Sequence, residues 1–471
     1  MVRCWPLLLV VACGPVPVTA PVDSGTPPVD AGAVDSGVQD AGALASPDSG
    51  SSPDAGPPPP ADAGAPRVAL RTPCAETFAQ VTEATADGGL ALGARIACSP
   101  DQRLTQVDTY FLSYRTTRGN GQPGASTARV FLPKSPRAAP APMVVIGHPS
   151  VGIADGCAPT REMNGVFSLA LPWAEKGYPV IAPDYAGLGN PGTHGYVDNH
   201  DTAYSMLDAA RALAALLEPG ALDGRQVMVG YSEGGGAVLS SQALEKTYGT
   251  FGELSAVIAY APQYNVRLNS FGYVSMFRNP DALTVAQGYT KPVVAALRQY
   301  GWYENYVGAG RGGEAFPAAS RMGTVDALEQ QCIIGLGAFL PSTRTHVRDL
   351  IDDELRTTFL ACVDGTAGCR DPGKKYYDGL VADLLVNDPG GAPVLIVQGM
   401  LDTVMPVGEE AACVVPKLRN DGVNLTLCTD GLAAHNNIYD RNVDLGVQWG
   451  EAKLHGTAPP TCTAATLPAC P

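Results

Sequence analysis

The sequence predicts an α/β fold in which helices flank a mostly parallel central sheet. Short apolar runs of strand length recur along the chain, and amphipathic stretches of helix length lie between many of them, an alternation typical of this fold class. The apolar runs are 128–133, 143–147, 179–183, 226–230, 256–260, 393–399 and 423–427, and the clearest helical stretches are 202–217 and 408–420. Hydrophobic residues make up 45% of the 471 residues, which is enough for a sizeable core.

The alternation stops between about residues 261 and 391. This interval lacks a convincing strand pattern, so we expect it to be an inserted and mainly helical cap. Strands resume at 393–399, which places both ends of the insertion next to the sheet.

The chain opens with the layout of an export signal. "MVRCWPLLLVVACGPV" has one arginine, an apolar run too short to span a bilayer, and then Val-Val-Ala-Cys at 10–13. These four residues resemble the lipobox of bacterial lipoproteins, which predicts a signal peptide over 1–13 and a lipidated Cys13. An ordinary cleaved signal with a chance cysteine is the alternative.

Residues 14–66 have the composition of a disordered linker. They repeat Asp-Ala-Gly and Asp-Ser-Gly, contain seven aspartates, and lack lysine, arginine and aromatic residues. Such a segment cannot bury enough apolar area to offset its ordering entropy. A calcium-binding repeat is the alternative, but calcium loops gather several oxygen ligands within about a dozen residues, whereas these aspartates are spread among prolines. We expect a spacer that holds a body, residues 67–471, away from a membrane.

Charge and cysteine content narrow the class of protein further. The net charge of −15 argues against a nucleic-acid partner and gives no support to direct binding of anionic lipid, so the N-terminal anchor is the only membrane contact expected. Ten of the twelve cysteines follow the leader, and none shows the CxxC spacing of a zinc site. They predict up to five disulfides in an exported protein, among which Cys362–Cys369 and Cys74–Cys98 are the easiest pairs to place.

A candidate nucleophile lies in "VMVGYSEGGGAV", residues 227–238. Gly230 to Gly234 fit G-x-S-x-G, the nucleophile elbow of α/β-hydrolases, in which a strained turn joins a strand to a helix. A strand pattern precedes Ser232 and a helical one follows it, so this serine is a better candidate than an isolated match would be. The alternative is a polar residue in a glycine-rich turn.

A serine nucleophile needs a base and a group that orients the base, and in this fold the chain order is serine, acid, histidine. Asp402 follows the strand 393–399, where it would lie at the sheet edge, although an aspartate there could instead cap a helix. His435 follows the last predicted strand. His455 also follows Asp402, but it lies near the C-terminal tail, where we expect it at the surface. His148 precedes the elbow and does not fit the order, so we interpret it as a loop organiser.

Acyl transfer also needs hydrogen-bond donors for the oxyanion of the tetrahedral intermediate. One predicted donor is the backbone amide of Glu233, directly after the nucleophile. The other should come from the loop 147–160, where Pro149 has no N–H and Ser150 is the nearest usable residue, with Val151 second.

Together these motifs resemble the secretory lipase family of α/β-hydrolases, also called the Candida lipase A-like family. The residues that carry the resemblance are "GYSEGG", "HPSVGIADGCAPT" and "PDYAGLGNPGTHGY", within roughly residues 100–450. The resemblance implies hydrolysis of carboxylic esters, including acylglycerols, a helical cap over the acyl pocket, and no metal or organic cofactor. It also implies a disulfide from Cys157 to a cap cysteine, most simply Cys332.

The sequence departs from the family pattern in two places. HPSVG stands where the family has HGTTG, and Glu233 replaces a glutamine, which adds a charge beside the nucleophile. Aromatic residues also gather in the cap between Phe271 and Phe316. They could line an acyl cleft, but the helices of a small cap need large residues for their own core, and we favour the core for most of them.

Three functional hypotheses follow from these features. The first is a serine hydrolase that cleaves carboxylic esters through an acyl-enzyme, either secreted or held at the cell envelope. The second is a peptidase or amidase on the same fold, because the same three groups also cleave amides. The third is a non-catalytic surface lipoprotein that binds a partner through the scaffold.

Overall fold

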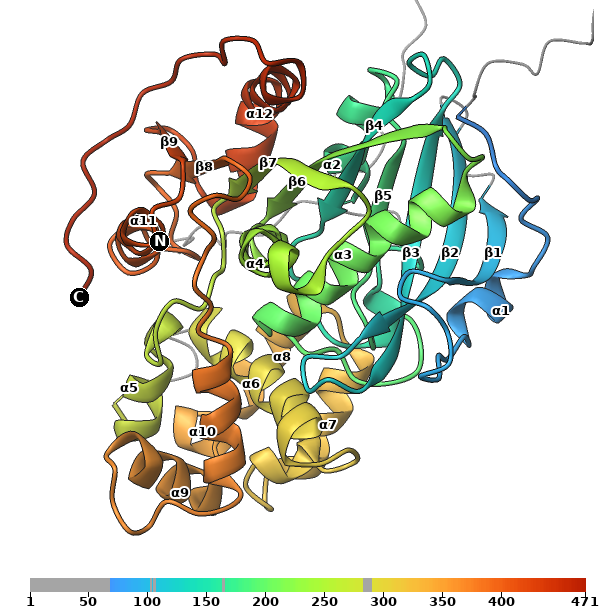
Figure 1. Cartoon of the computed structure of the whole chain (residues 1–471). Helices are drawn as coiled ribbons and strands as arrows, with labels where there is room; N and C mark the ends of the chain where they lie inside the picture. The colour runs from blue at the N-terminus through green and yellow to red at the C-terminus, as the bar shows by residue number, and fades with distance from the viewer. Residues whose placement is uncertain (1–67, 102–103, 105–106, 163–165, 283–289) are drawn as a thin grey trace, which may run out of the picture. The chain divides into compact units, whose positions relative to one another are not determined.

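The computed structural model describes residues 68–471 with gaps at 102–103, 105–106, 163–165 and 283–289. The chain divides into two units, Met1–Gly64 and Ala65–Pro471. The predicted signal peptide, Cys13 and the predicted linker 14–66 lie outside the described residues. All elements named below belong to the second unit (Figure 1).

A nine-stranded mixed sheet forms the centre of this unit and confirms the predicted α/β class. Its order is β1-β2-β3-β5-β4-β6-β7-β8-β9. The pairs β1–β2, β2–β3 and β3–β5 are antiparallel. The remaining neighbouring pairs, from β5 across to β9, are parallel. The strands are β1 (Arg95–Asp101), β2 (Val107–Thr117), β3 (Pro123–Pro133), β4 (Ala141–Gly147), β5 (Val180–Pro183), β6 (Leu222–Tyr231), β7 (Glu253–Tyr260), β8 (Val394–Gly399) and β9 (Leu425–Asp430).

The sequence pattern did not predict β1 and β2, because polar residues interrupt them. Within β2, Arg115 and Thr116 are buried, and the Thr116 hydroxyl donates to an Asp208 carboxylate oxygen at 2.8 Å. Asp208 lies on the packing helix α3 (Asn199–Leu216). Tertiary partners therefore satisfy polar groups that hydropathy alone would place at the surface.

Helices cover both faces of the sheet, and alternate residues of each strand point to opposite faces. In β6, Met228 packs in the cluster that contains α3, α4 (Glu233–Tyr248) and α11 (Ala411–Asn420), whereas its neighbour Val229 packs in the cluster that contains α2 and α12. Helix α2 spans Val166–Ala174, and helix α12 spans Ile438–His455. None of the helices that the structure describes is long and apolar enough to cross a membrane.

The interval between β7 and β8 is helical, and its described residues contain no strand. Its α-helices are α5 (Tyr273–Arg278), α6 (Thr290–Trp302), α7 (Arg321–Gln330), α8 (Ile333–Thr343), α9 (Asp353–Val363) and α10 (Gly373–Ala382), and we call them the cap. Figure 1 shows these helices gathered beside the sheet rather than on its flanking layers. Most of the cap's aromatic residues lie in a buried cluster of their own, which favours the core interpretation over a cleft wall.

Five disulfides connect the ten cysteines of this unit, in agreement with the expected number. The structure confirms the pairs Cys74–Cys98 and Cys362–Cys369, and also Cys157–Cys332, which joins the loop after β4 to the start of α8. The remaining two, Cys413–Cys470 and Cys428–Cys462, hold the C-terminal tail.

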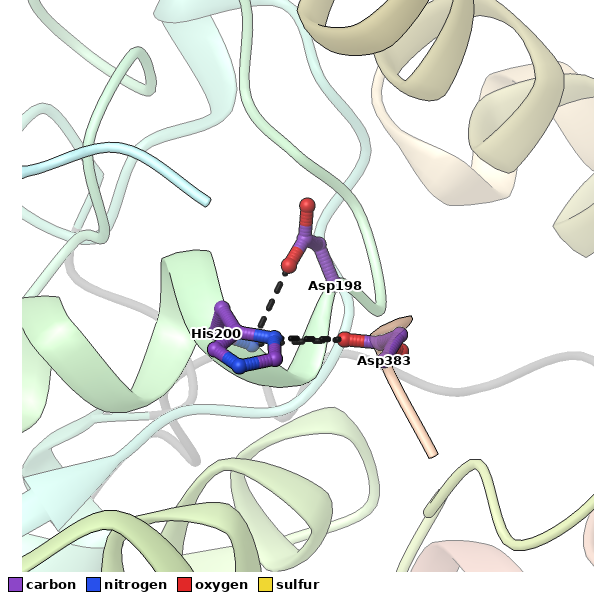
Figure 2. A group of neighbouring side chains, drawn as sticks. All are labelled: Asp198, His200 and Asp383. Carbon is purple, nitrogen blue, oxygen red and sulfur yellow. Dashed lines mark hydrogen bonds and ion pairs between the residues drawn. The ribbon is translucent and has the colours of Figure 1, made fainter. Parts of the chain in front are cut away.

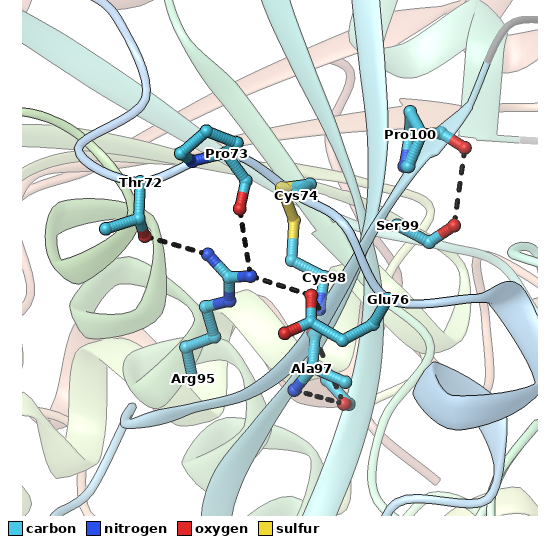
Figure 3. Close-up of a disulfide and its surroundings, with 10 residues drawn as sticks. Thr72, Pro73, Cys74, Glu76, Arg95, Ala97, Cys98, Ser99 and Pro100 are labelled. Carbon is cyan, nitrogen blue, oxygen red and sulfur yellow. Dashed lines mark hydrogen bonds and ion pairs between the residues drawn. A yellow bond between two sulfur atoms is a disulfide. The ribbon is translucent and has the colours of Figure 1, made fainter.

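Disulfides fasten extended chain over both edge strands of the sheet. At β1, Cys74–Cys98 holds the segment before α1 (Phe78–Thr82), where Glu76 binds both Arg95 and the Cys98 backbone N–H (Figure 3). At β9, the Thr429 N–H donates to the Thr463 carbonyl of the tail at 2.8 Å. An exposed edge strand can pair with a strand of another molecule. The segments held over β1 and β9 therefore protect the sheet against aggregation.

Candidate active site

Ser232 occupies the turn between β6 and α4. Its φ of 56° and ψ of −115° lie outside the regions that side chains ordinarily adopt, so the turn is strained. The surrounding hydrogen bonds hold it: the Ser232 N–H donates to the Tyr260 carbonyl at 2.9 Å, and the Ser232 carbonyl accepts from the N–H groups of Gly236 and Gln263.

The glycines of the elbow allow β4, β6 and α4 to approach closely. A Cβ added to Gly234 would lie 2.1 Å from the carbonyl oxygen of Gly147 at the end of β4. A Cβ added to Gly230 would lie 2.0 Å from the Gly234 carbonyl oxygen. The glycines on either side of Ser232 are therefore required by space.

The structure brings together the three residues that the sequence singled out. The His435 Nε2 atom lies 3.0 Å from the Ser232 Oγ atom, and the His435 Nδ1 atom lies 2.8 Å from an Asp402 carboxylate oxygen. Each residue follows a different parallel strand: Ser232 follows β6, Asp402 follows β8, and His435 follows β9. The carboxyl ends of these strands meet at one sheet edge, which explains the convergence of residues far apart in sequence.

The two carboxylate oxygens of Asp402 face different partners. One carboxylate oxygen accepts from the N–H groups of Val404 and Met405 at 2.9 and 2.7 Å, as a turn cap does. The other faces His435. Because the carboxylate can only accept, it favours the tautomer with hydrogen on Nδ1, which leaves Nε2 free to accept the Ser232 proton.

Ser150 and Glu233 are the two predicted oxyanion residues, and hydrogen bonds of Gln263 connect the segments that carry them. Ser150 follows β4, and its hydroxyl shares a 2.8 Å hydrogen bond with the Tyr196 hydroxyl and lies 3.5 Å from the Gln263 side-chain oxygen. Gln263 also donates its backbone N–H to Ser232. Glu233 is the first residue of α4, directly after Ser232.

The Glu233 side chain is buried and binds His194 rather than lying free beside the nucleophile. Its carboxylate accepts from the His194 Nε2–H at 2.8 Å. The His194 ring stacks on Tyr185, and Tyr185 stacks on His148. The stacked rings of His194, Tyr185 and His148 support the loop that carries Ser150. The contacts of His194, Tyr196 and Gln263 were not predicted from the sequence. The "PGTHGY" stretch was the available signal for the first two.

The other two histidines discussed above lie away from the base position. Burial lowers the pKa of His148, and its ring nitrogens lie 2.7 Å from the Pro149 carbonyl and 3.1 Å from the Asp184 carbonyl, which fits a loop organiser. His455 is the exposed last residue of α12.

Among the described residues, Asp198, His200 and Asp383 form one group with the composition of a metal site (Figure 2). Their atoms are already engaged: Asp198 caps α3 by accepting from the backbone N–H groups of His200 and Asp201, and Asp383 accepts from the Asn199 N–H at 2.7 Å. Asp383 follows α10, so the group fastens the end of the cap to the start of α3.

The group formed by Asp198, His200 and Asp383 is expected to stabilise the folded chain less as the pH rises. Burial, followed by the nearby Asp383 charge, raises the pKa of Asp198 to about 7. Burial lowers the pKa of His200, but its hydrogen bond to Asp383 and the surrounding carboxylates outweigh burial and raise it. Both groups hold protons more tightly in the folded chain. The stabilisation from Asp198 is therefore complete below about pH 4, its unfolded value, and is lost as the pH rises through about 7.

Asp198→Asn tests this expectation, because asparagine also caps helices but does not titrate. Relative to the variant, the wild-type free energy of unfolding should fall by about 4 kcal/mol between about pH 4 and pH 8. Denaturant unfolding across this range measures the difference. A constant difference between the two proteins would contradict the assignment.

Residues 164–261 match the family model described as secretory lipase. The chain is similar to this family over that segment. The matched segment includes β6, the elbow and Ser232. This similarity supports a carboxylic ester hydrolase and suggests export. No curated protein matches the sequence.

Solved structures with the same fold include three from different organisms. Candida antarctica lipase A in its closed state superposes with a TM-score of 0.62 at 18% identity, over 83% of this chain and 89% of that one. The rice cell wall degrading esterase LipA from Xanthomonas oryzae gives 0.57 at 17% identity, over 78% and 97%. A putative hydrolase from Legionella pneumophila gives 0.53 at 18%, over 74% and 90%. At these identities the likeness concerns the fold.

Proposed function

We propose that this secretory lipase relative cleaves carboxylic esters of lipids or acylglycerols through an acyl-enzyme on Ser232. The supporting observation is the unbroken chain of hydrogen bonds from Ser232 through His435 to Asp402. Ser232 and Asp402 are buried, each 5% exposed, and His435 is partly buried. A hydroxyl in this setting gains a base that is already oriented.

In the proposed reaction, the Ser232 oxygen attacks the ester carbonyl carbon while His435 Nε2 takes the hydroxyl proton. Asp402 stabilises the imidazolium that forms. The tetrahedral intermediate collapses, and His435 returns the proton to the departing alcohol, which leaves an acyl group on Ser232. Water then attacks the acyl carbonyl with His435 again as the base, releasing the acid and restoring Ser232.

The oxyanion of each intermediate would accept hydrogen bonds from the backbone N–H groups of Glu233 and Ser150. The Glu233 amide lies at the N-terminus of the 16-residue helix α4, where the helix dipole favours negative charge. The bonds from Ser150 to Tyr196 and Gln263 support the second donor by limiting movement of its loop. Such donors are effective because they are oriented before the reaction begins.

Hydrolysis of acyl esters and amides side by side tests the proposed reaction. The purified chain should release p-nitrophenol from p-nitrophenyl esters and should not release p-nitroaniline from aminoacyl p-nitroanilides. A series from acetate to stearate would define the acyl length. Cleavage of the anilides alone would indicate a peptidase, and cleavage of neither class would indicate a non-catalytic protein.

We also propose that Cys13 becomes the lipidated N-terminus and that residues 14–66 tether the hydrolase to a membrane of the cell envelope. The lipobox-like sequence and the composition of the linker support this arrangement. Incorporation of an alkyne-labelled fatty acid by the wild type but not by Cys13→Ser would bear it out. Equal labelling of both proteins would contradict it.

A further inference from the structure

The cap contains a buried cation without an anionic partner. Arg298 lies on α6 and is 2% exposed. Among the residues that the structure describes, its guanidinium makes no hydrogen bond or ion pair, and its buried Nε atom is without a hydrogen-bond acceptor. Other buried arginines differ: Arg129 pairs with Asp101, and Arg118 pairs with Asp201.

The Arg298 guanidinium lies over aromatic rings. Its central carbon lies 4.7 Å from the Trp302 ring centroid and 5.2 Å from the Tyr273 ring centroid. Attraction to ring faces offsets only part of the cost of removing a cation from water. Arg298 therefore retains several N–H donors and a positive charge that the protein itself does not satisfy.

A short series of contacts connects Arg298 with the surroundings of Ser232. Trp302, one turn along α6, donates its ring N–H to the Tyr196 carbonyl at 3.1 Å, and the Tyr196 hydroxyl bonds Ser150. Burial raises the pKa of Tyr196, and the positive charge of Arg298 acts in the opposite direction. These contacts join the cap helix that carries Arg298 to the polar cluster beside the nucleophile.

We propose that Arg298 recognises a carboxylate on the acyl chain of the substrate, so that the enzyme prefers half-esters of dicarboxylic acids to neutral esters of equal length. This inference rests on the proposed ester hydrolysis at Ser232. A guanidinium presents parallel N–H donors that match the two oxygens of a carboxylate, and the pairing gains strength where water is excluded.

Matched pairs of p-nitrophenyl esters test the proposal. Each pair has one acyl length, with and without a terminal carboxylate: adipate with hexanoate, suberate with octanoate, and sebacate with decanoate. For the wild type, kcat/KM should favour the acid by about tenfold or more in at least one pair, the contribution of one charge-assisted contact. Arg298→Met should abolish this preference while it retains hydrolysis of the neutral partner.

Two further variants control for folding and for general charge effects. Arg298→Lys keeps the charge but loses the paired donors, so its preference should be intermediate, and it decides the question if Arg298→Met does not fold. Arg278→Met removes an exposed cap cation that pairs with Asp364 and should leave the preference unchanged. Thermal melting establishes that each variant is folded.

The outcomes separate this inference from the proposed function. Hydrolysis of the neutral esters without preference for any acid, or a preference that survives in Arg298→Met, would overturn the role of Arg298 and leave ester hydrolysis intact. Absence of hydrolysis for both members of every pair would overturn the proposed function and this inference with it.

Discussion

Replacement of Ser232 by alanine is expected to lower kcat/KM for p-nitrophenyl esters by about 10³- to 10⁶-fold, because the residue that forms the acyl-enzyme is lost. The chain should remain folded, since the change removes one oxygen and the backbone bonds of the elbow persist. Steady-state kinetics measure the first effect, and thermal melting measures the second.

Ser240→Ala is the matched control for this substitution. Ser240 is also buried on α4, but its hydroxyl bonds the carbonyl of Gly236 on the same helix and does not contact His435. Its removal should leave kcat/KM nearly unchanged. Turnover retained in Ser232→Ala would place the nucleophile elsewhere.

The second large effect is expected from Gly234→Ala. The added methyl would lie 2.1 Å from the oxygen and 2.2 Å from the carbon of the Gly147 carbonyl, and backbone atoms cannot rotate out of the way. Helix α4 would have to move away from β4. We expect a loss of about 3 kcal/mol or more in the free energy of unfolding, with loss of activity because the elbow shifts.

Denaturant unfolding of Gly234→Ala and of a control, Gly88→Ala, measures this effect. A Cβ at Gly88 would meet only Pro123 at 3.7 Å, an ordinary contact, so the control should be close to wild type. Equal stability of the two variants would mean that the elbow does not need the close approach of α4 and β4.

The sequence predicted the parts of this molecule that local pattern determines. Buried parallel strands are continuously apolar, so β4 to β8 were recognisable from their residues alone. The elbow was recognisable because its glycines stand at fixed offsets from the serine. The convergence of Ser232, Asp402 and His435 could be expected because parallel strands deliver their following residues to one edge.

The remaining features depend on contacts between distant segments. Strand β2 carries polar residues whose partners lie on α3, and no local pattern reveals such partners. The sequence indicated a charge at Glu233 but not that His194, far away along the chain, would bind it. The two tail disulfides join Cys413 on α11 and Cys428 on β9 to cysteines in a tail without secondary structure, so spacing gave no guide.

The central claim is that His435 activates Ser232 for attack on an acyl or phosphonyl centre. Covalent labelling with a fluorophosphonate, followed by mass analysis of the digested protein, tests it most directly. The account predicts one adduct, on the peptide that contains Ser232, formed on the order of 10³-fold more slowly or not at all in His435→Ala. An adduct at another residue, or equally fast labelling of Ser232 without His435, would contradict it.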